Sequence, residues 1–311
     1  MSSTEDGRVA HLTARLASLK REKHATVLAH VYTVPEVQDV ADFVGDSLGL
    51  SQQAAALDPS IRIIVFCGVH FMAETAAMLC PDRTVLLPDP TAGCPMADMV
   101  TDEDVRAMRR DHPGAAVACY VNSTAAVKAE SDVCVTSSNA VRVITRLAER
   151  EVIFVPDRSL GLWVQKQLPD KRLILWDGFC PIHHSMLRSQ VEAARRAHPG
   201  ALVLAHPENT EELLELADFI GSTEQIVRHA RESKGTEFII ATENGILHRL
   251  RAQNPGKTFH PVAEWAVCPN MKKNTLESVV ACLEGELNPV TVDPAVAGRA
   301  LRAINRMLEL S

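Results

Sequence analysis

The sequence reads TVLAHVY at residues 26–32, AVACYVN at 116–122 and LVLAHPE at 202–208. Each of these apolar runs ends in polar residues and opens a segment that closes on a cysteine followed by proline, at Cys94, Cys180 and Cys268. The closing cysteines keep nearly the same spacing as the opening runs, which is the mark of an internal repeat. The repeat predicts three similar units and one metal site built from their closing cysteines.

Further landmarks recur inside each copy. ADFVGDS (41–47), SDVCVTS (131–137) and ADFIGST (217–223) follow the opening runs, and a second Val- and Ile-rich run follows each of them. Short apolar runs that alternate with helical segments are typical of parallel strands covered on both faces. Each copy is interpreted as strand, helix, strand, helix, strand. The sequence therefore predicts an α/β fold of three similar three-layer αβα units, with short parallel sheets around a pseudo-three-fold axis and the metal site at their junction.

The expected boundaries follow from this spacing. We expect an N-terminal helix in residues 1–25, αβα units at 26–112, 113–199 and 200–287, and a C-terminal helix in 288–311 that packs on unit 1.

Composition restricts the class of protein. The net charge of −7 and the lack of a basic stripe argue against nucleic acid as a partner. The polar, acidic start is unlike a secretory signal, and no apolar run reaches the length of about 18 residues that a membrane helix needs. We expect a soluble cytoplasmic protein that binds no membrane.

The cysteines divide into two groups. Five lie in or beside apolar segments and are interpreted as small buried hydrophobes: Cys67, Cys80, Cys119, Cys134 and Cys282. The three closing cysteines could hold zinc, or a [4Fe-4S] cluster with one iron left for substrate. Ligands so far apart in the chain favour the cluster, while His183, three residues after Cys180, leaves a local ligand role open.

Polar residues gather where strands end and helices begin. The strand ends carry His30 and Tyr32, Tyr120 and Asn122, and His206 and Glu208. The expected helix starts carry Asp46 and Ser47, Thr136 and Ser137, and Ser222 and Thr223. Ligands of α/β sheets bind at the carboxyl ends of strands, and helix starts bind anions. These positions predict acid–base groups beside an anion site, with simple helix capping as the alternative for the helix starts.

Long stretches of the chain resemble the quinolinate synthase family of bacterial NAD biosynthesis. The resemblance covers residues 29–277 and is carried by AHVYTVPEVQDVADFVGDSL, AGCPMAD, YVNSTAAVKAESDVCVTSSNA, GFCPIHH, AHPEN, ATENGILHRL and CPNMKKNTLE. The family condenses iminoaspartate with dihydroxyacetone phosphate to quinolinate, releasing phosphate and water. It is classed as a transferase, and its [4Fe-4S] cluster acts as a Lewis acid.

The resemblance also implies roles for individual residues. The cluster ligands would be Cys94, Cys180 and Cys268, and the proton-transfer groups Tyr32, Tyr120, Glu208 and His206. The substrate-binding set would be His30, Asp46, Ser47, Asn122, Ser137, His183, His206, Glu208 and Thr223. A transient contact with L-aspartate oxidase would deliver iminoaspartate. Many members have cysteine where this chain has Asn209, which puts disulfide-based regulation in doubt but not the cluster.

Two other classes of function remain open. One is another three-unit, three-cysteine iron–sulfur enzyme, such as the diphosphate reductase of isoprenoid synthesis or the radical enzyme of diphthamide synthesis. The other is a cluster-holding sensor, which should carry a DNA-binding or partner-binding segment, and the sequence shows none.

Overall fold

The computed structural model describes residues 3–311 and the side chains from residue 7 onward. The chain forms two compact lobes, each from two segments. Lobe I comprises the chain up to Cys94 together with Cys268–Asp293, and lobe II comprises Pro95–Val267 together with Pro294–Ser311. The lobes are described separately below.

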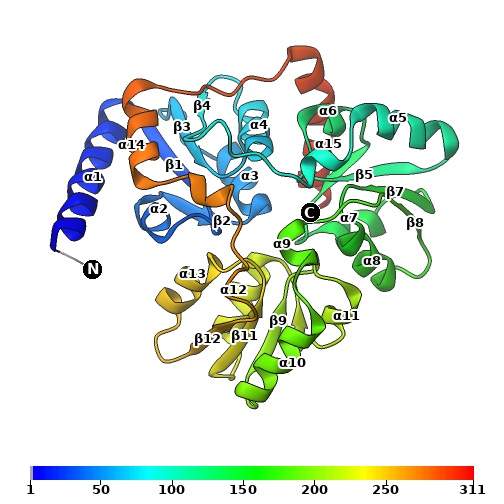
Figure 1. The fold of residues 1–311 in the computed structure, drawn as a ribbon. Helices are drawn as coiled ribbons and strands as arrows, with labels where there is room; N and C mark the ends of the chain where they lie inside the picture. Colours follow the sequence, from blue (N-terminus) through cyan, green and yellow to red (C-terminus); the bar gives the residue numbers. More distant parts are fainter. Residues whose placement is uncertain (1–2) are drawn as a thin grey trace. The chain divides into compact units, whose positions relative to one another are not determined.

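The described residues contain three four-stranded parallel sheets, one in lobe I and two in lobe II (Figure 1). Sheet 1 consists of β1 (Ala25–His30), β2 (Phe43–Gly45), β3 (Ile63–Cys67) and β4 (Thr84–Leu86). Sheet 2 consists of β5 (Ala116–Tyr120), β6 (Val133–Val135), β7 (Glu151–Val155) and β8 (Arg172–Leu175). Sheet 3 consists of β9 (Leu202–Ala205), β10 (Phe219–Ile220), β11 (Glu237–Ala241) and β12 (Thr258–Pro261). In each sheet the strand that comes second in the chain lies at the edge beside the first, giving the spatial order 2-1-3-4. This confirms the predicted α/β fold of three similar units.

One strand in each sheet was not expected. The landmarks around residues 41–47, 131–137 and 217–223 contain the short strands β2, β6 and β10, so each unit has four strands where three were predicted. A strand of two or three residues is too short to show an alternating or continuous apolar pattern.

The same aspartate fixes this short strand to its neighbour in all three sheets. The backbone N–H and the carboxylate of Asp42 bond the carbonyl and the N–H of Val27, and Asp132 and Asp218 do the same with Val117 and Val203. The side-chain bonds are 2.8, 2.7 and 2.7 Å long. The repeat in the sequence therefore corresponds to a set of hydrogen bonds that recurs in all three sheets.

The helices between strands follow the repeat. Within sheet 1 these are α2 (Pro35–Val40), α3 (Ser47–Ala55) and α4 (His70–Leu79). Sheet 2 has α6 (Ala125–Ala129), α7 (Ala140–Thr145) and α8 (Arg158–Gln167), and sheet 3 has α11 (Glu211–Leu214), α12 (Thr223–Glu232) and α13 (Ile246–Gln253). After the last strands come η1 (Ala97–Met99), α9 (Pro181–His184) and η2 (Met271–Lys273).

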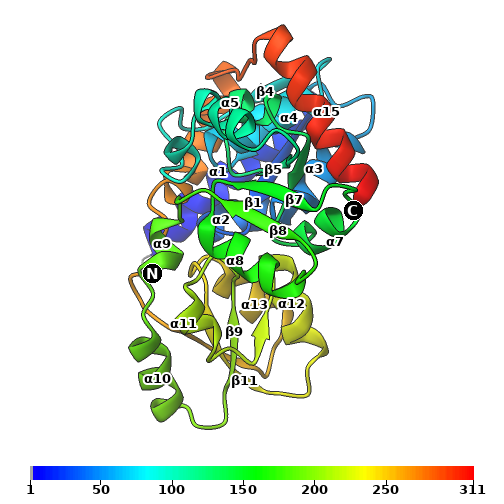
Figure 2. The same ribbon diagram turned by 90° about the vertical axis from the view of Figure 1, so that its right-hand side faces the viewer.

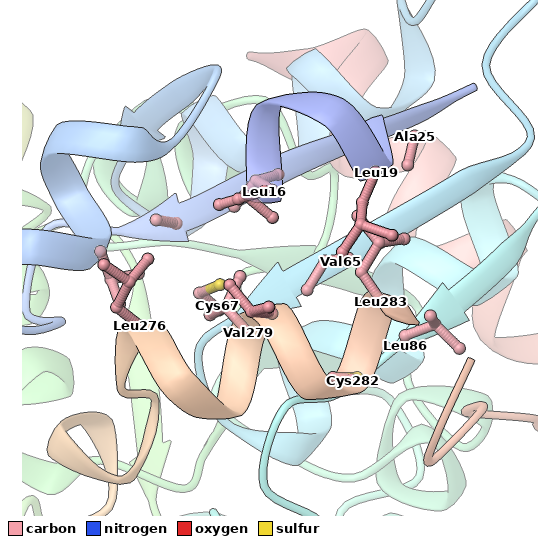
Figure 3. Close-up of a cluster of buried hydrophobic side chains, with 14 of the residues drawn as sticks. Leu16, Leu19, Ala25, Val65, Cys67, Leu86, Leu276, Val279, Cys282 and Leu283 are labelled. Carbon is pink, nitrogen blue, oxygen red and sulfur yellow. The ribbon is translucent and has the colours of Figure 1, made fainter. Parts of the chain in front are cut away.

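The helix that follows each sheet covers the next sheet, which corrects the predicted boundaries. Val105 of α5 (Asp102–Asp111) packs into the core of sheet 2, and Val191 of α10 (Arg188–Ala197) packs into that of sheet 3 (Figure 2). In lobe I, α14 (Leu276–Gly285) packs with α1 (Ser3–Glu22) on sheet 1. Figure 3 shows Val279 of α14 facing Leu16 of α1, and Leu283 of α14 facing Leu19, in this core. The boundaries at 112/113 and 199/200 and the end at 287 are thus each misplaced by one helix.

The C-terminal helix also differs from expectation. Its extent, α15 (Pro294–Leu310), falls within the predicted 288–311, but it packs against α6 and β6 of lobe II and not on unit 1. Ala300, Ala303, Ile304 and Met307 form its fully buried face. An amphipathic pattern shows which face of a helix is buried but not which sheet receives it.

Among the helices of residues 3–311, none has the combined length and hydropathy that crossing a bilayer would require.

Candidate active site

The polar residues of lobe II lie at the switch points of its two sheets. In the order 2-1-3-4, the first and third strands are neighbours whose connections leave on opposite sides, and ligands bind beyond their carboxyl ends. In sheet 2 these ends carry Tyr120 and, after β7, Asp157. In sheet 3 they carry His206 and, after β11, Thr242.

A buried carboxylate joins the two sheets of lobe II. The Tyr120 hydroxyl donates a 2.6 Å hydrogen bond to Oε1 of Glu208. Nδ1 of His183 lies 2.8 Å from the other oxygen, Oε2, and all three residues are at most 4% exposed. Two residues that the sequence places in unit 2 and one that it places in unit 3 therefore form one hydrogen-bonded group.

The contacts within this group place the negative charge on Glu208 and keep Tyr120 protonated. Burial alone would raise the pKa of Glu208, but the imidazoles of His183 and His206 and the Tyr120 hydroxyl together hold that pKa well below its usual range. Burial and the Glu208 charge raise the pKa of Tyr120 well above 10. Glu208 is thus an ionised acceptor and Tyr120 a protonated donor at neutral pH.

His206 has a defined tautomer. Its Nδ1 accepts the backbone N–H of Glu208 at 3.3 Å, so Nε2 carries the proton of the neutral ring. Nε2 lies 3.2 Å from the Ser137 hydroxyl. In lobe I, His30 has the same arrangement, since its Nδ1 accepts the backbone N–H of Tyr32 at 3.2 Å. The His-x-Tyr and His-x-Glu pairs are therefore equivalent in structure as well as in sequence.

Cys180 lies beside the carboxylate group. Its Sγ is 3.2 Å from Nδ1 of His183, and the ligand atoms of Cys180, His183 and Glu208 all lie within 4.8 Å of one another. Oδ2 of the fully buried Asp157 accepts the backbone N–H of Cys180 at 3.2 Å, while Oδ1 caps α8 through Leu160 at 2.6 Å. Asp157 thus positions the cysteine that begins α9.

The expected helix starts serve as caps and also meet one another. Asp46 caps α3 through the backbone N–H of Gly49, as the capping alternative proposed. In lobe II, Ser138 donates a 2.7 Å bond to Ser222, the cap of α12, so the starts of α7 and α12 are in contact. Thr223, the first residue of α12, is buried.

The predicted site residues of lobe I lie in both of the chain segments that form this lobe. The His30 and Tyr32 rings are 4.6 Å apart between centroids, and the Lys272 ammonium donates to the Tyr32 carbonyl. Cys94 and Cys268 are half-buried at the two ends of the segments that form this lobe.

The structure therefore brings together part of the predicted site. Within lobe II it joins the following residues through contacts: Tyr120, Ser137, Cys180, His183, His206 and Glu208. Within lobe I it joins His30 and Tyr32. The convergence of Cys94, Cys180 and Cys268 on one metal stays a prediction. The five cysteines expected to be buried hydrophobes are all buried, as predicted.

Sequence reasoning missed two residues of this group. Asp157 holds the backbone of Cys180, and the Thr242 hydroxyl lies 2.8 Å from Nε2 of His183. Both follow the third strand of their unit, in VPD and ATE, so the repeat itself could have found them as counterparts of the first-strand pairs.

Among the buried polar atoms that lack a partner in the described residues, one belongs to a predicted substrate-binding residue. Within the described part of the chain, Oδ1 of Asn122 accepts no hydrogen bond and is shielded from solvent. An orphaned buried acceptor is costly, so it marks a place where a bound molecule could donate.

Comparison with known proteins agrees with these observations. The model of the family described as quinolinate synthetase A protein matches residues 14–309. A quinolinate synthase of Caldicellulosiruptor saccharolyticus is 48% identical over 303 residues, which cover 97% of this chain and 99% of that protein. Those of Methanosarcina barkeri and Methanoregula boonei are each 52% identical, over 96% and 97% of this chain and 97% and 99% of their own. The chain belongs to the quinolinate synthetase A protein family.

Proposed function

We propose that this protein is a quinolinate synthase that condenses iminoaspartate with dihydroxyacetone phosphate, releasing phosphate and water, in NAD biosynthesis. The observation that carries the proposal is the buried Glu208 carboxylate, bonded to Tyr120 and His183 beside Cys180, in a member of this family. A condensation followed by dehydration needs groups that take and return protons. An ionised carboxylate in contact with a protonated phenol provides both.

The donor set suits an iron–sulfur cluster. Cys94, Cys180 and Cys268 follow the last strands of the three sheets, and each is half-buried. Thiolates are the usual ligands of [4Fe-4S] clusters, and these three residues would hold one per chain. When bound, such a cluster with three protein ligands supplies a Lewis acid at its fourth iron. The hydrogen bond from the Cys180 backbone to Asp157 fixes one of these sulfurs in advance.

The protein's own residues would then bind and orient the substrates. The Nε2 protons of His30 and His206 and the hydroxyls of Ser47, Ser137 and Thr223 are donors suited to carboxylate and phosphate oxygens. Asp46 keeps the start of α3 in place for Ser47. Asn122 offers its unpartnered acceptor to a substrate N–H or O–H.

Proton transfer is assigned to residues that surround Glu208. Its carboxylate is the base, because His183 and Tyr120 keep it ionised although it is buried. Tyr120 is the acid that returns a proton from its phenol oxygen, and Tyr32 is assigned as a further proton-transfer group, in lobe I. Thr242 holds the ring of His183 in position.

The test combines metal analysis with an activity assay. Protein prepared without oxygen should contain about four irons and four sulfides per chain and should form quinolinate from the two substrates. Cys180→Ser should lose the visible cluster spectrum, whereas Cys282→Ser should keep it, because Cys282 is buried in the core of sheet 1. Zinc without sulfide, or a normal spectrum in Cys180→Ser, would contradict the assignment.

The distances also favour a second candidate, a zinc enzyme. Cys180, His183 and Glu208 place one sulfur, one nitrogen and one carboxylate oxygen within 4.8 Å, a set that zinc accepts while keeping an open position. Stoichiometric zinc that is lost in His183→Gln, with no iron present, would select this candidate.

The proposal extends to the cell. The enzyme would act in the cytoplasm and take iminoaspartate from L-aspartate oxidase by transient contact. Coupled assays with the two proteins mixed or separated by a dialysis membrane would show whether contact increases the yield of quinolinate.

A further inference from the structure

A second group of metal-ligand side chains lies in lobe II, away from the site above. Oε1 of Glu237 is 3.1 Å from Nδ1 of His198 and 2.9 Å from Nε2 of His260. The two imidazole rings stack with centroids 3.5 Å apart, and the three ligand atoms lie within 4.8 Å of one another.

Three separate elements of sheet 3 hold this group together. His198 ends α10, Glu237 is the first residue of β11, and His260 lies in β12 opposite Ile239. Below them, Ile239 and Val191 belong to one buried apolar cluster that fixes α10 on the sheet. The side chains are 24–37% exposed, so water can complete the coordination of an ion.

The group is distinct from the candidate active site. It lies at the amino end of β11, whereas Thr242 and His206 lie at the carboxyl end of the same sheet. The five residues of β11 separate the two ends by about 13 Å at roughly 3.3 Å per residue.

The repeat provides an internal comparison. In the unit of sheet 2, the residues that lie 86 positions before His198, Glu237 and His260 are His112, Glu151 and Ile174, in that order. His112 ends α5 with φ −131° and ψ 67°, nearly the −131° and 71° of His198. In sheet 2, however, the third position is Ile174, and Glu151 pairs with Arg172 at 2.5 Å. Only the sheet 3 copy has both imidazoles around its carboxylate.

We propose that His198, Glu237 and His260 form a second, surface site for a divalent first-row transition ion such as Zn²⁺. Two imidazoles and one carboxylate are a ligand set that such ions accept, and Mg²⁺ prefers oxygen ligands. Nδ1 of His198 and Nε2 of His260, the ring nitrogens that face Oε1, bind the ion in their unprotonated form, and each neutral ring keeps its one proton on its other nitrogen. It ties the end of α10 to two strands.

The test titrates Zn²⁺ into the full-length protein, prepared without oxygen and with the metal it already carries, by calorimetry. His260→Gln and His198→Ala should weaken this binding by at least about tenfold, since removing a ligand costs no less than removing the partner of one. His112→Ala is the matched control and should bind as the wild type does. Any Zn²⁺ taken up at Cys180 is common to all these proteins and cancels.

A second measurement does not depend on the variants. Crystals soaked in Zn²⁺ should show an anomalous peak between His198, Glu237 and His260, and Mg²⁺ in excess should not displace it. Equal isotherms for wild type and His260→Gln, an equal loss in His112→Ala, or no peak at these three residues would overturn the proposal.

Discussion

Glu208 is a carboxylate that stays charged where water is excluded. Its two oxygens are divided between Tyr120 at 2.6 Å and His183 at 2.8 Å, so neither oxygen is left without a donor. Without such partners, the desolvation of a buried carboxylate would strongly destabilise the fold. The same bonds make Tyr120 hold its proton, and this coupling is open to direct measurement.

The chain has two tyrosines, so one substitution isolates the titration of Tyr120. In Tyr32→Phe, tyrosinate absorbance should appear only well above pH 10, because burial and the Glu208 charge both oppose the phenolate and raise its pKa. Adding Glu208→Gln removes the charge and should move the titration to lower pH. An onset near pH 10 in Tyr32→Phe, unchanged by the second substitution, would show that the two groups are not coupled.

Glu208→Gln should also abolish most of the activity. Loss of a general base lowers the rate by about 10²–10⁴-fold, while iron and sulfide content should stay at the wild-type level. Glu212→Gln is the control, because Glu212 lies nearby on α11. The measurement is kcat/KM for quinolinate formation, and a loss of less than about tenfold would remove Glu208 from the role of base.

Asp157→Ala tests whether the backbone of Cys180 is held in advance. The substitution removes a helix cap, worth about 1 kcal/mol, and also the acceptor for the Cys180 N–H. Thr101→Ala removes the cap of α5 alone. Urea unfolding should show a loss in both variants, but only Asp157→Ala should release iron faster to a chelator. Equal rates of release would mean that Asp157 is a cap and nothing more.

Much of the site at this scale could be predicted, because the strand-end pairs are the polar residues in otherwise apolar repeats. The repeat marks Asp157 and Thr242 as polar residues that follow third strands, but it does not by itself assign them to the site. A polar residue at a strand end is commonly a cap or turn residue, and a single sequence does not show which of them also reaches a neighbouring side chain.

At the scale of elements, α14 is the test of the corrected boundaries. Leu283→Ala should destabilise sheet 1 by about 2–5 kcal/mol, as expected for a fully buried leucine, because Leu283 packs with α1 and the strands of that sheet (Figure 3). Leu287→Ala is matched in chemistry, but Leu287 is 49% exposed and should cost less than about 0.5 kcal/mol. Chemical denaturation followed by circular dichroism compares them. Equal losses would argue against this packing.

Element types were predictable and their partners were not. The extents of α12 and α15 agree with the sequence patterns, since polar caps and an amphipathic face mark both. Contacts between residues far apart in the sequence determine which sheet α5, α10 or α14 covers. Each of these helices could bury its apolar face against either neighbouring sheet, and its amphipathic sequence pattern would be the same in both cases.

At the scale of the whole molecule, the two lobes should respond separately to removal of α15. Deleting residues 294–311 uncovers α6 and β6, against which Ile304 and Met307 are fully buried. Hydrogen exchange should then accelerate in β5 and β6 of lobe II, while β1 and β3 of lobe I keep their protection. Equal acceleration in both lobes would mean that they unfold as one cooperative unit.

The placement of α14 also has a consequence for the order in which the chain is made. The sheet that leaves the ribosome first receives this cover only from Leu276 onward, 190 residues after β4 ends at Leu86. At roughly 5–20 residues per second, synthesis of that interval takes about 10–40 s. For this time the face of the nascent N-terminal sheet that α14 shares with α1 is only partly covered. The part of the protein that begins to fold first therefore waits for this cover until most of the chain has been made, and it is a part on which a chaperone would act.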